Sequence, residues 1–170
     1  MERECGECKL CCKCLSIVEI VKPGGKWCPH AKGKGCDIYE DRPPSCKQFR
    51  CAWLDGLTPE EFRPDKVHAV FVVEGTPDIP IISCYEHING IALASKKLRW
   101  CIENFKAEDG ERLETGIISP QGERTLLNER LEVIEKLPPH VMFTLEDGWE
   151  LEVQKLAESF SKFLAKGGAK

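Results

Sequence analysis

The sequence predicts an α+β protein: an irregular, cysteine-rich, metal-stapled lobe packed on a small mixed or antiparallel sheet with two main helices. The chain has 170 residues, the size of one domain. Nine of its 11 cysteines lie among the first 51 residues. Near residue 65 the composition changes to apolar strand-like and helix-like patterns. We therefore expect a metal-binding lobe over 1–64 and a small α+β portion over 65–170, packed together as one unit.

The first 64 residues predict only short elements between cysteine-rich turns. The β-branched run 15–21 indicates a short strand, which the turn at Pro23 ends. A helix is expected over 45–54, with Ser45 as its N-cap, and it must end or bend if Cys46 and Cys51 bind one ion. Thr58 and Pro59 predict a further short helix that stops at Pro64.

The remaining residues predict the sheet and the two main helices. Strands are expected over 68–73 and 79–85, a hairpin joins 116–119 to 123–127, and a last strand covers 141–145. Apolar residues at helical spacing predict amphipathic helices over 93–105 and 149–164. Cys84 and Cys101 fall in the apolar patterns of a strand and a helix, so we expect buried, inert thiols there.

The cysteine spacing predicts a metal centre. Two thiolates separated by two residues can hold one ion, and this step occurs twice in succession near the N-terminus. Cys14 is an additional thiol, and His30 is expected beside the ligands rather than among them. The expected ligands are Cys5, Cys8, Cys11, Cys12, Cys28, Cys36, Cys46 and Cys51.

Ligand chemistry narrows the choice of metal without deciding it. Thiolates are soft ligands and select zinc, cuprous copper or iron–sulfur clusters. Eight cysteines account for about two zinc ions with four thiolates each. An iron–sulfur cluster uses the same kind of ligands. The spread of the ligands over 5–51, as in domains where zinc is a structural staple, favours zinc slightly.

Composition bounds the location and the partners. We expect a cytoplasmic protein, since no run of about 18 apolar residues and no secretory signal is seen. In such a reducing compartment dense thiols are metal ligands or redox groups more often than disulfides. The net charge of −4 argues against generic binding of duplex DNA. A zinc-stapled module for a protein or RNA partner stays open as a further alternative.

The cysteine pattern, with Cys28-Pro-His30 and the run from Cys36 to Pro43, resembles the YkgJ-type cysteine-cluster family. That family is described as a zinc- or iron-chelating domain, and the resemblance covers about residues 5–53. It implies metal binding through the eight cysteines named above. A related domain occurs in flagellin lysine methylases, which implies, as an alternative, an iron–sulfur protein that forms part of a methyl-transfer enzyme. An iron–sulfur centre acting in electron transfer is an alternative that the cysteine spacing itself leaves open.

Overall fold

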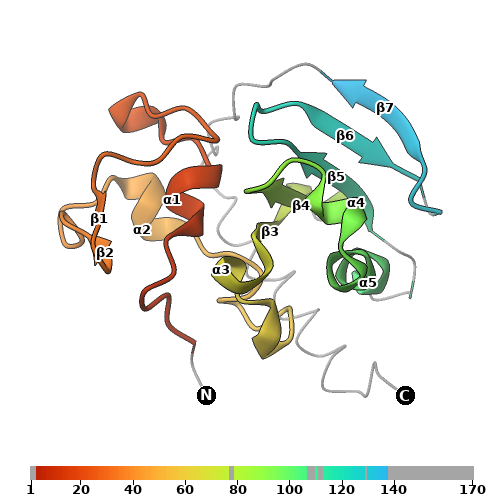
Figure 1. The fold of residues 1–170 in the computed structure, drawn as a ribbon, viewed down its shortest axis with the longest axis horizontal. Helices are drawn as coiled ribbons and strands as arrows, with labels where there is room; N and C mark the ends of the chain where they lie inside the picture. Colours follow the sequence, from red (N-terminus) through yellow and green to blue (C-terminus); the bar gives the residue numbers. More distant parts are fainter. Residues whose placement is uncertain (1–2, 77–78, 107–109, 111–112, 129, 138–170) are drawn as a thin grey trace.

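A five-stranded mixed sheet forms the centre of the computed structural model, which describes residues 3–76, 79–106, 110, 113–128 and 130–137 (Figure 1). The strands lie in the order β3-β4-β5-β6-β7, and only the β4–β5 pair is parallel. Their bounds are β3 Ala69–Thr76, β4 Ile79–Glu86, β5 Glu114–Ile118, β6 Arg124–Leu127 and β7 Val133–Leu137. The α+β class expected from the sequence is therefore confirmed.

The predicted hairpins are present. Strands β3 and β4 pair over their full length, and β5 pairs with β6 around the turn that contains Gly122. Strand β7 was not predicted, because two charged residues interrupt its short apolar pattern and most of it is exposed. The expected strand 141–145 and helix 149–164 lie outside the described residues.

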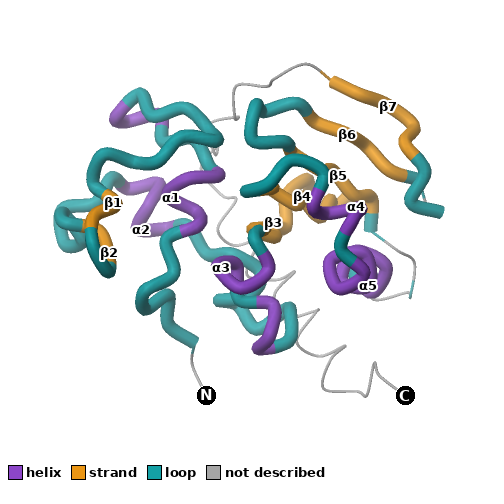
Figure 2. Tube along the Cα trace, in the orientation of Figure 1, coloured by secondary structure: helices purple, strands orange, loops and turns teal. Residues whose placement is uncertain are grey.

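The parallel pair β4–β5 needs a crossover, and two helices supply it (Figure 2). The helix expected over 93–105 is split into α4 (Ile91–Ala94) and α5 (Lys96–Asn104). The split occurs because Ser95 caps α5, where its side chain accepts a hydrogen bond from the Leu98 amide at 3.3 Å. The buried carboxylate of Glu86 accepts hydrogen bonds from the amides of Gly90 and Ala92 and so holds the start of α4.

Only short elements occur in the described part of residues 1–64. Two predictions here are wrong. Residues 15–21 do not form a strand, since the chain folds back in a loop closed by paired backbone hydrogen bonds between Ile17 and Lys22. The elements are α1 Leu10–Cys14, η1 Val18–Ile20, β1 Ala31–Lys32, β2 Gly35–Cys36, α2 Pro44–Gln48, η2 Glu60–Phe62 and α3 Pro64–Val67.

The helix expected over 45–54 is the second correction. It begins at Pro44 and ends at Gln48, because the following chain turns to the sheet, where the Ala52 amide bonds the Phe71 carbonyl at 2.9 Å. Ser45 is not the cap. Its amide and hydroxyl instead donate to the Glu19 carboxylate at 3.0 and 2.8 Å.

The sheet is covered on both faces, with α1 on one side and α5 on the other (Figure 1). Alternate residues of β3 enter two different cores, because neighbouring side chains of a strand point to opposite faces. Phe71 packs in the core beside α5, with Leu98 and Ile102. Val70 packs beside α1, with Leu10 and Trp53. Within the described chain, no helix is long and apolar enough to span a membrane.

Gly25, in the N-terminal loops, lies against the backbone of Pro120, which follows β5. This close contact provides a test of the packing. Gly25 has φ +75°, and a Cβ there would lie 1.7 Å from the Pro120 carbonyl oxygen. We expect Gly25→Ala to lower the free energy of unfolding by more than about 2 kcal/mol, because it adds a clash to the backbone strain. Gly33→Ala is the control, since Gly33 also has positive φ but open space around it. Urea unfolding of both variants measures the difference, and equal destabilisation would contradict the contact.

Candidate metal centre

Backbone hydrogen bonds gather the cysteine-bearing segments around α1. The Cys8 amide donates to the Cys5 carbonyl at 3.0 Å, which forms the turn between the first two thiols. Helix α1 then carries Cys11 and Cys12. The Cys28 amide donates to the Cys12 carbonyl at 3.0 Å, so a segment 16 residues further along the chain is fixed beside the helix. None of the eight expected ligands is fully exposed.

Four of the cysteine side chains interact electrostatically with one another. Cys5 interacts with Cys8, and Cys51 interacts with both of them. Cys11 interacts with Cys5 and Cys51. Burial is the first cause that raises the pKa of Cys5, and it raises the pKa of Cys51 to about 11. We call Cys5, Cys8, Cys11 and Cys51 the first cysteine group.

A second set of cysteines is connected by backbone contacts and by an electrostatic interaction. Cys46 interacts electrostatically with Cys12 and Cys28, which the backbone hydrogen bond already joins. Cys36 lies in the β1–β2 hairpin opposite Ala31, whose amide bonds the Cys28 carbonyl at 3.0 Å. We call Cys12, Cys28, Cys36 and Cys46 the second cysteine group.

Cys11 and Cys12 connect the two groups through a side-chain hydrogen bond. This bond lowers the pKa of Cys12 and raises that of Cys11, because Cys11 is the donor and favours the thiolate form of its partner. Positive charge on Lys22, Lys9 and Arg42 also lowers the pKa of Cys12.

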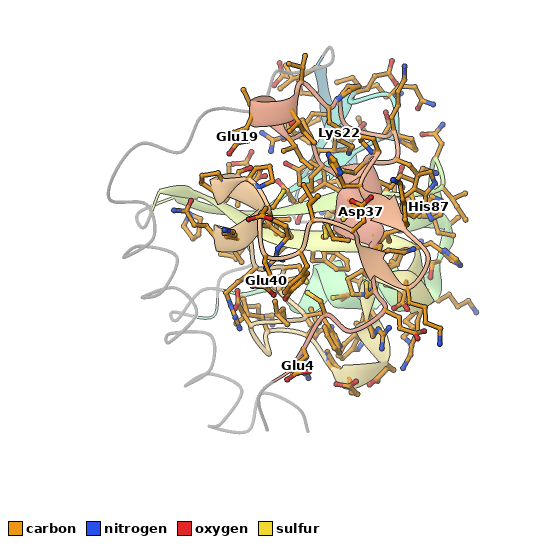
Figure 3. The ribbon with its side chains drawn as sticks, turned by 90° about the vertical axis from the view of Figure 1, so that its left-hand side faces the viewer. Glu4, Glu19, Lys22, Asp37, Glu40 and His87 are labelled. Carbon is orange, nitrogen blue, oxygen red and sulfur yellow. The ribbon has the colours of Figure 1, made fainter. Side chains whose placement is uncertain are left out.

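Lys22 is the buried cation of this region, and the sequence patterns did not single it out. Its side chain is only 5% exposed. Its ammonium group donates to the Lys13 carbonyl at 3.0 Å and to the Leu15 carbonyl, both at the C-terminal end of α1. Burial lowers the pKa of Lys22, and negative charge on Cys28 and Cys12 opposes that effect. Figure 3 faces this side of the molecule and labels Lys22. The only signal in the sequence is a lysine that ends an apolar run.

Arginines supply positive charge to the first cysteine group. Arg42 and Arg50 both act on Cys5, and Arg63 forms a hydrogen bond with Cys8. Arg42 is itself held by Tyr39, whose carbonyl accepts from its Nε at 2.8 Å and whose ring lies 3.6 Å below the guanidinium carbon. These contacts hold the positive charge of Arg42 beside the thiols.

The remaining cysteines and His30 occupy other positions. The Nδ1 of His30 lies 3.0 Å from Asp37, and Lys32 binds the same carboxylate at 2.7 Å. Cys14 is buried in the core beside α1, and burial raises its pKa to about 11. Cys84 and Cys101 are buried in the core on the α5 side of the sheet, as expected.

Among the described residues, no three His, Cys, Asp or Glu side chains are already arranged around one point as ligands of an ion. The chemistry of the donors nevertheless fits a thiophilic metal. Thiols from distant segments are close enough to shift each other's pKa, and basic side chains close to them act to lower the pKa of Cys5 and Cys12. Bound thiolates carry negative charge, which such cations stabilise.

Comparison with models of known protein families gave no match. Searches among curated proteins and among solved structures gave none either.

The two carbonyls held by Lys22 provide a test of its structural role. We expect Lys22→Met to lower the free energy of unfolding by about 1.5–3 kcal/mol, because it removes hydrogen bonds from a charged donor to buried acceptors. Lys26→Met is the matched control, since Lys26 is exposed on the same loop. Thermal and urea unfolding check the result, and equal stability of the two variants would contradict it.

Proposed function

We propose that this protein binds metal through its eight N-terminal cysteines, and that the metal has a structural or regulatory role. The observation that carries the proposal is the gathering of thiols from segments up to 46 residues apart, Cys5 to Cys51, within electrostatic range of each other. Free thiols so close together are an oxidation liability. Metal binding explains both their number and the cations beside them.

The two cysteine groups suggest how the ligands divide. The first group would hold one ion with Cys5, Cys8, Cys11 and Cys51. The second would hold another with Cys12, Cys28, Cys36 and Cys46. The sulfurs of each group would turn toward their ion on binding, while the backbone contacts between the segments stay in place. His30 supports the hairpin through Asp37 and is not a ligand in this proposal.

Zinc is the metal that we propose. Two groups of four thiolates match two tetrahedral zinc ions, and zinc would serve as a staple for a region that has only short helices and two-residue strands. Its chemical contribution is to cross-link the segments without redox activity. Binding free energy of this kind becomes folding free energy.

An iron–sulfur cluster is the alternative. Its ligands are also cysteine thiolates, and they tolerate the adjacent Cys11–Cys12 pair. Electron transfer or part of a methyl-transfer reaction would then be the function, and the family resemblance implies the second of these. A zinc-stapled module for a protein or RNA partner is the remaining alternative.

Serine variants test the ligand division. Replacing Cys8 or Cys46 by Ser should each lower the metal content from about two zinc ions per chain to about one, because each variant damages only one group. The double variant should lose both ions. Elemental analysis of the purified proteins gives the stoichiometry.

Cys84→Ala and Cys101→Ala are the matched controls for these variants, because both thiols are buried away from the proposed ligands. Their metal content should stay at the wild-type value. Loss of metal in either control would show that the site is drawn wrongly. Full metal content in Cys8→Ser and Cys46→Ser would refute metal binding by these groups.

The absorption spectrum of anaerobically purified protein distinguishes the two kinds of metal. We expect a colourless protein with about two zinc ions per chain and no acid-labile sulfide. Broad visible absorption together with iron and sulfide would refute zinc and support the electron-transfer alternative.

A further inference from the structure

Two histidines lie side by side where the β3–β4 pair ends, outside both cysteine groups. His68 precedes β3, and His87 follows β4. The His87 amide donates to the His68 carbonyl at 2.9 Å, which fixes the two residues relative to each other. Their ring centroids are 5.7 Å apart, with 58° between the ring planes. The antiparallel register of the sheet, not proximity in sequence, brings the two imidazoles together.

This separation matches two imidazoles that share one metal ion. A zinc–imidazole bond is about 2.0–2.1 Å long and a ring nitrogen lies about 1.1 Å from its ring centre, so rings on one ion have centroids about 5–6 Å apart. The centroid separation of 5.7 Å between His68 and His87 lies within this range. The 58° between the ring planes is not that of face-to-face stacked rings.

The backbone and the surroundings of both histidines are unusual. His68 has φ 59° and ψ 30°, a left-handed conformation that ends α3 and is uncommon outside glycine. The Nδ1 atom of His87 is buried and, in the described part of the chain, has no hydrogen-bond partner. Trp27 packs its ring edge-on against His87, with centroids 6.3 Å apart. A buried ring nitrogen without a partner is satisfied when the imidazole binds an ion.

His87 is held in the form that binds metals. Burial lowers its pKa, and the positive charges of Lys13 and His68 lower it further. The neutral imidazole is the ligand form. Lys13, which lies 5.8 Å from the Trp27 ring centre, also opposes a cation at this place, so the ion is held weakly.

We propose that His68 and His87 form a metal site separate from both cysteine groups, which binds one divalent transition-metal ion of the zinc or nickel type. Imidazole ligands suit these ions. Among the described residues no third His, Cys, Asp or Glu joins the pair, so the other coordination positions are open to water or to a small ligand. The site is exchangeable, unlike a closed site with four thiolates. It does not depend on what the cysteines bind.

Isothermal titration with Zn²⁺ tests the proposal on the whole protein as purified, so that any metal on the cysteines is already present. We expect one additional binding event of about one ion per chain. It should weaken at least tenfold in His68→Asn and in His87→Gln. Asparagine is chosen at residue 68 because it tolerates the left-handed conformation. His30→Asn is the matched control, since His30 pairs with Asp37, and it should keep wild-type binding.

Two further measurements exclude trivial explanations. Circular dichroism and urea unfolding must show that both variants are folded, and Lys13→Gln should tighten binding severalfold by removing the opposing charge. In a Ni²⁺ titration, quenching of Trp27 fluorescence should disappear in His87→Gln, because the bound ion lies beside that ring. Absence of an additional event, or an event of equal affinity in both folded histidine variants, would overturn the proposal.

Discussion

Burial of both faces of β3 is the constraint on which the rest of the structure depends. Val70 faces the α1 side and Phe71 faces the α5 side, and both are almost fully buried. A strand in this situation needs a covering layer on each face. Helix α5 provides one layer, and the cysteine-bearing N-terminal region provides the other. The metal centre that we propose therefore lies in a layer that the sheet itself needs.

Hydrogen bonds from side chains to backbone carbonyls fix the chain within the covering layer. Trp53 is buried and donates its indole N–H to the Glu60 carbonyl at 3.1 Å. Arg3 reaches the carbonyls of Trp53 and Thr58 at 2.6 and 2.7 Å. Charged hydrogen bonds of this kind are stronger than neutral ones. They help to fix the chain between the cysteines and the sheet.

A network of polar side chains lies on the same face of the sheet as Val70. The Glu74 carboxylate accepts hydrogen bonds from Ser83 at 2.5 Å, from the Tyr85 hydroxyl and from Arg124 at 2.6 Å. Gly116 leaves space for this arginine, since a Cβ there would lie 3.2 Å from its Nε. Every member of the network has a partner, which makes a partly buried charge pair tolerable.

The sequence alone determined the elements that depend on local patterns. Apolar, β-branched runs bounded by turn residues identified β3 and β4, and a helical period identified most of α5. Cysteine spacing identified the candidate ligands, because two thiols in one turn need no tertiary information. The burial of Cys84 and Cys101 also followed from their apolar surroundings. Metal binding itself stays a prediction from these residues.

Tertiary structure decided the features that depend on distant partners. The chain leaves α2 at Gln48 because Ala52 pairs with β3, and residues 15–21 form a closed loop rather than a strand. Lys22 became a buried cation because the carbonyls at the end of α1 lie within its reach. The approach of His68 and His87 depends on strand register. None of these contacts has a sequence period, since each joins residues whose separation is set by the packing of whole elements.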